Sequence, residues 1–98
     1  MSKKLENKRL KHVKFKEGIN TYRDLIEYTV RHVPDGGLTF KRIEDGLRII
    51  EQCEKMEFED ADFNNLKIML QGVKFGQGNV SFEVLSELNE FSKYINKL

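Results

Sequence analysis

The chain has 98 residues, of which 39% are hydrophobic and 34% charged, and its formal net charge is +1. This length predicts one domain with a small core. No apolar run approaches the roughly 20 residues of a membrane span, the polar N-terminus lacks the apolar part of a secretory signal, and one Cys excludes an internal disulfide, so we expect a cytoplasmic protein.

The charge is divided unevenly along the chain. Residues 1–16 carry seven Lys or Arg and a single acidic residue, Glu6, whereas the remainder carries ten basic and fifteen acidic residues. We predict a mobile basic tail over residues 1–9 and a single helical domain over residues 10–98. Such an arm can bind nucleic acid or an acidic partner, or can fold back on its own body. The candidate contact residues are Lys3, Lys4, Lys8, Arg9 and Lys11.

The first elements of the predicted domain are a short strand and a helix. Residues 11–16 alternate, with Val13 and Phe15 on one side, which is typical of a strand. Thr21 is a good N-cap for a helix that Pro34 ends. The predicted inward face of that helix consists of Tyr22, Leu25, Ile26, Thr29, Val30 and Val33.

A five-residue pattern then occurs twice, as Gly36-Gly37-Leu38-Thr39-Phe40 and as Gly78-Asn79-Val80-Ser81-Phe82. In each copy Gly permits a tight turn, the next apolar residue enters the core, and the hydroxyl caps a helix. We expect Phe40 and Phe82 to be buried where two helix–turn–helix units meet. The helix that follows Thr39 has one predicted apolar face, and Gly46 within it indicates a close approach between helices. That face consists of Phe40, Ile43, Leu47, Ile50 and Cys53.

Residues 55–59 form a second alternating stretch, with Met56 and Phe58 on one side. Pairing it with residues 11–16 would set Lys14 and Lys16 against Glu57 and Glu59. Asp60 or Asp62 is expected to cap a third helix, and Ser81 a fourth. The fourth helix turns Val84, Leu85, Leu88, Phe91, Ile95 and Leu98 inward. The predicted fold is mainly α, with four helices as two helix–turn–helix units and a minor two-stranded antiparallel ribbon.

The two repeated loops resemble the second half of an EF-hand loop, with the Gly, the apolar residue, the hydroxyl and the Phe that opens the exit helix. Calcium needs oxygen ligands at loop positions 1, 3, 5 and 12. Among those positions only Asp35 carries a carboxylate. The resemblance therefore implies degenerate, calcium-free loops.

The acidic cluster after the second helix could bind a metal, act as an acid–base pair, or form a helix cap and a solvated interaction surface. It comprises Glu54, Glu57, Glu59, Asp60 and Asp62. His12 and His32 stand far apart, and Cys53 lies on an apolar helical face, typical of a buried small hydrophobe. No spacing favours nucleophilic catalysis or a phosphate loop. We expect no enzymatic activity and no cofactor.

Three segments carry a further resemblance. They are the strand before Thr21-Tyr22-Arg23-Asp24-Leu25, the run from Gly37-Leu38-Thr39-Phe40 to Leu47-Arg48-Ile49-Ile50, and the acidic residues 57–63 that enter a helix. Over about residues 10–75 the chain resembles small accessory proteins of tailed bacteriophages. This implies a non-enzymatic protein-interaction module that binds a host or phage protein in the host cytoplasm. The alternatives are a nucleic-acid-binding protein that uses the basic tail, and a small virion or assembly subunit that folds fully in an oligomer.

Overall fold

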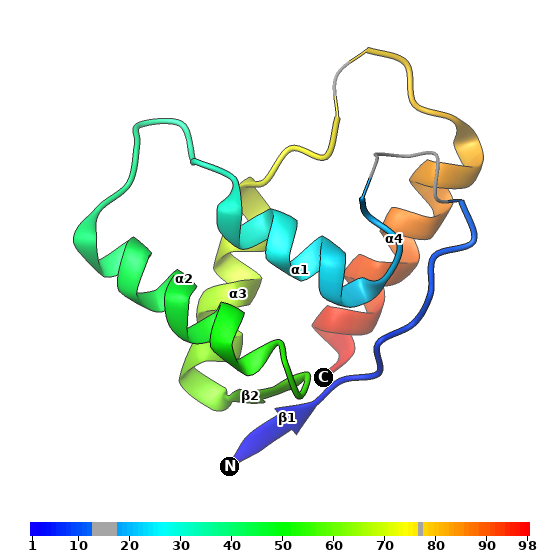
Figure 1. Ribbon diagram of the computed structural model, residues 1–98. Helices are drawn as coiled ribbons and strands as arrows, with labels where there is room; N and C mark the ends of the chain where they lie inside the picture. Colours follow the sequence, from blue (N-terminus) through cyan, green and yellow to red (C-terminus); the bar gives the residue numbers. More distant parts are fainter. Residues whose placement is uncertain (13–17, 77) are drawn as a thin grey trace.

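The computed structural model describes residues 1–12, 18–76 and 78–98. In this part of the chain four helices and two short strands follow one another in sequence (Figure 1). They are β1 (Ser2–Lys4), α1 (Tyr22–Arg31), α2 (Phe40–Gln52), β2 (Glu57–Glu59), α3 (Asp60–Gly72) and α4 (Phe82–Lys97). The mainly helical fold with a two-stranded antiparallel ribbon is confirmed, whereas the grouping into two helix–turn–helix units stays a prediction.

The ribbon has the expected second strand and an unexpected first strand. β1 pairs antiparallel with β2, with Ser2 opposite Glu59, Lys3 opposite Phe58 and Lys4 opposite Glu57. The segment that the sequence predicts as a mobile tail over residues 1–9 is thus paired with β2 and packed against the body in the structure. Leu5 is buried and its backbone N–H donates to the carbonyl of Met56 over 2.8 Å, so apolar burial and backbone pairing hold this segment. Most of the strand expected over residues 11–16 lies outside the described residues.

The predicted hydroxyl caps are confirmed, because Thr21, Thr39 and Ser81 each accept a backbone hydrogen bond in the first turn of α1, α2 and α4. The expected Asp cap of α3 is wrong. Glu59 occupies the N-cap without a side-chain bond, and Asp60 and Asp62 lie within the first turn. The turns before α2 and α4 use glycines at positive φ, namely Gly36, Gly37 and Gly78.

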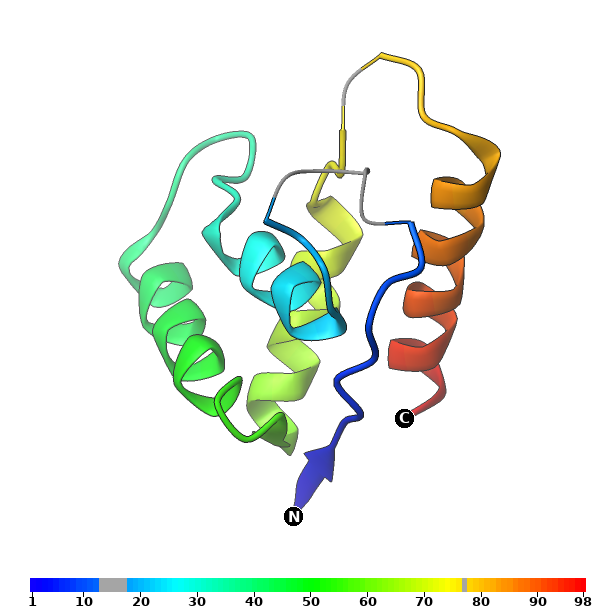
Figure 2. The same cartoon turned by 45° about the vertical axis from the view of Figure 1, so that its right-hand side comes forward.

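The core lies between α1, α3 and the N-terminal part of the chain, with α2 on one side and α4 on the other (Figures 1 and 2). Both views show the N-terminal segment running beside α4. Its Leu5 and Leu10 belong to the core, and the Arg9 backbone bridges to Thr21. From α4, Phe91 and Ile95 enter the same core. No helix of the described residues is long and apolar enough to cross a membrane.

Candidate functional site

α2 faces the core with a different side from the one that the sequence predicts. Its buried residues are Asp45, Gly46 and Ile49, and Cys53 at its C-cap is fully buried. At Gly46 a β-carbon would meet the Val30 side chain at 3.0 Å, so the missing side chain lets α1 and α2 approach closely. The expected close approach at Gly46 is confirmed.

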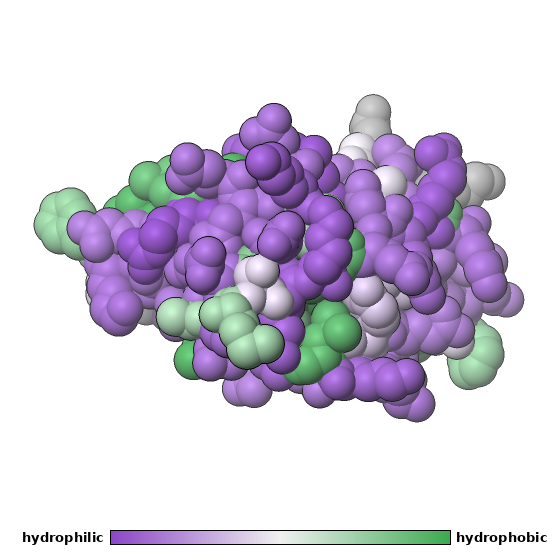
Figure 3. All heavy atoms as spheres, turned by 90° about the horizontal axis from the view of Figure 1, so that it is seen from below, coloured by the Kyte–Doolittle hydropathy of each residue, from purple (hydrophilic) through white to green (hydrophobic). Residues whose placement is uncertain are grey.

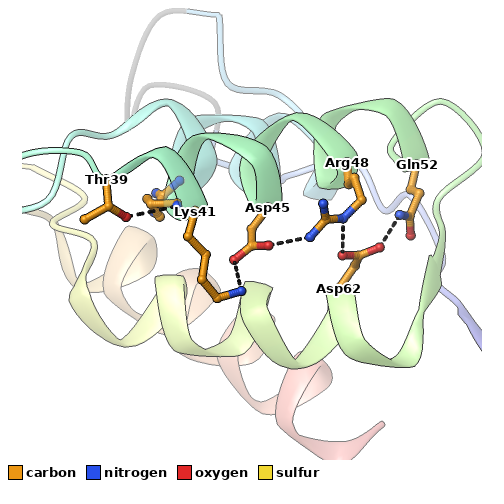
Figure 4. A network of polar contacts seen from close by, with 7 residues as sticks. Thr39, Lys41, Asp45, Arg48, Gln52 and Asp62 are labelled. Atoms are coloured by element: carbon orange, nitrogen blue, oxygen red, sulfur yellow. Dashed lines mark hydrogen bonds and ion pairs between the residues drawn. The ribbon is translucent and has the colours of Figure 1, made fainter.

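A polar network between α2 and α3 also fixes this orientation (Figure 4). Arg48 donates from Nε to Asp62 over 3.1 Å and also pairs with Asp45, whose carboxylate lies 3.2 Å from the ammonium of Lys41. Gln52 donates to the other oxygen of Asp62 over 2.6 Å. The hydrogen bond with Asp62 is the main reason that the pKa of Arg48 is raised. The network attaches α2 to α3 by the side opposite to its exposed apolar residues.

The consequence is a row of apolar side chains on the outside of α2, which we name the α2 stripe. It consists of Leu38, Phe40, Ile43, Leu47 and Ile50. Phe40 is 87% exposed and Leu47 64% exposed, while Ile50 is half-buried. Figure 3, seen from below, shows some apolar side chains at the left-hand margin, on the side where α2 lies, and others near the centre and at the right of a mostly hydrophilic face.

The stripe overturns the predicted burial of the repeated phenylalanines. Phe40 and its counterpart Phe82, which is 79% exposed, are each the first residue of their helix and point away from the core. Leu38 is also exposed, because Gly46, Ile49 and Cys53 supply the contacts of α2 to the core instead. The hydroxyl caps fix where these helices begin, and tertiary packing decides which face is covered.

A shallow groove of about 250 Å³ runs along the stripe between α2 and the end of α1. Gly46 and Val30 lie in it, together with Ile43, Leu47 and Ile50. Arg42, also at the groove, donates to the carbonyls of Thr29, Val30 and His32 at 3.2–3.5 Å, and so caps the C-terminus of α1. Burial lowers the pKa of Arg42, an effect opposed by Asp45.

The other edge of the stripe is acidic. Glu44 and Glu51 lie four positions after Phe40 and Leu47, and side chains at that spacing are neighbours on a helical surface. Glu54 follows in the turn directly after α2. All three are exposed, and within the part of the chain that the structure describes none has an ion pair. The site therefore combines apolar side chains, a groove and an uncompensated negative edge.

The structure ties most of the predicted basic contact residues to the body. Lys4 donates from Nζ to the carbonyl of Lys55, and Lys3 lies opposite Phe58 in the ribbon. The ammonium of Lys8 lies 5.5 Å from the centre of the Tyr94 ring. The backbone N–H of Lys11 donates to the Glu87 carboxylate over 2.6 Å, and the Arg9 backbone bridges to Thr21.

The predicted acidic cluster is split by the fold. Glu54, Glu57, Glu59 and Asp60 are exposed, and Glu57 accepts a 2.8 Å hydrogen bond from the Ser2 hydroxyl. Asp62 is only 6% exposed and cannot share their surface, because Arg48 and Gln52 hold its carboxylate against α2. Only Glu54 of this cluster belongs to the acidic edge of the stripe.

Other titratable groups are bound into the core. Burial raises the pKa of the Cys53 thiol from 9.0 to about 12, with a further rise from Glu27 and an opposing effect of Arg23. Burial, followed by the charges of Glu90 and Glu87, raises the pKa of Tyr22. Among the described residues no three His, Cys, Asp or Glu side chains are grouped to hold a metal ion.

The sequence predicted all five residues of the α2 stripe as apolar contact residues, but it predicted them to be buried and not exposed. The available signal was a second apolar row on the same helix, formed by Ile49 and Cys53 with Gly46 between α2 and its neighbour. In comparisons of the chain with protein-family models, curated proteins and solved structures, no match was found.

Proposed function

We propose that this protein is a non-enzymatic protein–protein interaction module whose partner binds the α2 stripe. The observation that carries the proposal is the exposure of Phe40 and Leu47 beside a groove, on a helix whose other side is firmly packed. Scattered exposed apolar residues are ordinary, whereas a contiguous patch edged by charges marks interaction sites. The resemblance noted above supports an accessory role toward a host or phage protein.

A protein partner is favoured over nucleic acid by the charge around the stripe. Glu44, Glu51 and Glu54 would repel phosphates from this surface. The basic residues at the N-terminus lie along a segment packed on the body, where the ammonium groups of Lys4 and Lys8 and the backbone N–H of Lys11 have contacts. Nucleic-acid binding through this segment is the alternative function, and the following experiment distinguishes it from protein binding at the stripe.

The test is affinity capture from bacterial lysate, with and without nuclease, followed by binding with the purified captured protein. The parent chain is compared with the Phe40→Ser/Leu47→Ser variant and with the matched control Phe82→Ser, which removes an equally exposed Phe at the same position of the other repeat. We expect binding that survives nuclease and the control but disappears in the stripe variant. Binding that is lost with nuclease, or that persists in the stripe variant, contradicts the proposal.

A further inference from the structure

We propose that the α2 stripe receives an amphipathic helix of a partner protein, with Lys or Arg along the flank that faces Glu44, Glu51 and Glu54. This inference rests on the proposed function and specifies the chemistry of the partner. It follows from the spacing of the stripe, the shape of the groove and the distribution of charge on its two edges.

The spacing of the stripe suits a helical partner. Phe40, Ile43, Leu47 and Ile50 are separated by three, four and three positions. This is the spacing of a seam at which two helices pack with their side chains interdigitated. Partner helices that bind in grooves present anchors with the same i, i+3, i+4, i+7 periodicity.

The groove limits how much of the partner can enter. The groove has a volume of about 250 Å³. The end of α1 lines one side of it and Ile43 and Leu47 line the other, and Gly46 and Val30, where the two helices approach closely, also line it. A space of this size accepts one or two side chains of a helix lying along α2. Leu38 and Phe40 extend the apolar surface beyond the groove toward the start of α2.

The two edges of the stripe differ in charge. Glu44, Glu51 and Glu54 are exposed and have no ion pair among the described residues, whereas the nearby carboxylates of Asp45 and Asp62 are compensated by Arg48. At the α1 edge, Arg31 lies 3.7 Å from Glu27, and Arg42 is bound to the carbonyls at the end of α1. The uncompensated charge is therefore negative and lies on one flank, so a complementary helix is basic on that flank.

A second copy of this chain fits the stripe less well. An antiparallel pair of α2 helices would bring the acidic edges of the two copies together, and like charges at such an edge disfavour the pairing. In a parallel pair the acidic edge would meet the Arg31 edge, where Arg31 shares the Glu27 carboxylate with Arg23, and sedimentation of the chain alone tests for such a pair.

The experiment uses two synthetic helical peptides that share Leu at the seam positions and differ only on one flank, which carries Lys in one and Glu in the other. Binding to the full chain is followed by fluorescence anisotropy. We expect the Lys peptide to bind roughly three- to tenfold more tightly at low salt. The difference should largely disappear at roughly 1 M salt, where charges are screened.

Two variants and one control assign the preference to residues. Glu44→Lys/Glu51→Lys should reverse the order of the two peptides, Phe40→Ser/Leu47→Ser should abolish binding of both, and Phe82→Ser should change neither. Sedimentation of the chain alone should show a monomer over the concentrations used.

Equal binding of the two peptides, binding of neither, or a dimer that the stripe variant dissociates would overturn the inference. Such results would leave the capture experiment of the proposed function unaffected. Loss of stripe-dependent capture would instead contradict the proposed function, so the two failures are distinguishable.

Discussion

Helices α2 and α4 begin with the same local pattern, a Gly-containing turn, a hydroxyl cap and an exposed Phe, but their apolar rows have different surroundings. In α4, Val84, Phe91 and Ile95 are buried. Phe91 meets the Tyr22 ring edge-on at a centroid distance of 4.9 Å. In α2, Ile43 and Leu47 remain exposed. A local signal thus sets where a helix begins, and distant segments decide which of its faces is covered.

The cover over α4 comes from the beginning of the chain. The N–H of Glu6 donates to the Tyr94 hydroxyl over 2.8 Å, and the N–H groups of Lys11 and His12 donate to the two oxygens of Glu87. No segment of the described residues covers the α2 stripe in this way. The row on α4 therefore belongs to the core, whereas the row on α2 is the one that we propose binds a partner.

The largest expected effect is that of Phe91→Ala. Because Phe91 is 2% exposed and lies at the contact of α4 with α1, its truncation should lower the free energy of unfolding by about 3–5 kcal/mol. Chemical denaturation followed by circular dichroism measures the loss. A loss below about 1 kcal/mol would show that α4 contributes little to the core.

Leu5→Ala tests the N-terminal part of that cover. Leu5 is buried in the core, so the variant should lose about 2–5 kcal/mol. The control Glu6→Ala removes an exposed side chain next to it and should stay within about 0.5 kcal/mol of the parent. If both variants changed the free energy of unfolding equally and only slightly, the result would support the mobile tail that the sequence predicts.

Asp62→Ala tests what holds α2 in its orientation. The variant removes acceptors from Arg48 and Gln52 and should cost about 1–3 kcal/mol by thermal or chemical unfolding. Asp60→Ala, in the same turn but exposed, should cost less, about 0.3–1 kcal/mol from the helix dipole. A larger effect at Asp60 than at Asp62 would contradict the structural role of the network.

A smaller effect concerns pH and the Cys53 thiol. Since burial raises its pKa from 9.0 to about 12, unfolding between these values releases a proton, and stability decreases as the pH rises above about 9. By pH 9.5 this contribution should lower the free energy of unfolding by roughly 1 kcal/mol. The Cys53→Ala variant should lose less than the parent over the same interval, and identical pH profiles would show that the thiol does not contribute.

The sequence predicted the parts of the fold that depend on neighbouring residues. The caps Thr21, Thr39 and Ser81, the close approach at Gly46 and the burial of Cys53 are confirmed. The partner of β2 and the covered face of α2 depend on contacts between distant segments. Residues 2–4 have no apolar alternation, so the sequence did not indicate them as the partner of β2. The predicted face of α2 was the apolar row that the structure leaves exposed.

The same limit applies to the candidate site. The predicted acidic cluster was a run of neighbouring residues in the sequence that included Glu54. The acidic edge in the structure instead combines Glu54 with Glu44 and Glu51 from the preceding turns of α2. Asp62 was assigned to the surface because the sequence does not reveal that Arg48 reaches across from α2.

The most direct test is the free energy of unfolding of the Phe40→Ala/Leu47→Ala double variant. Both side chains are largely exposed, so we predict a value within about 0.5 kcal/mol of the parent, although the same change at a buried Phe costs about 3–5 kcal/mol. A loss of more than about 2 kcal/mol would show that these side chains belong to the core, and would contradict the proposal that the α2 stripe is open to a partner.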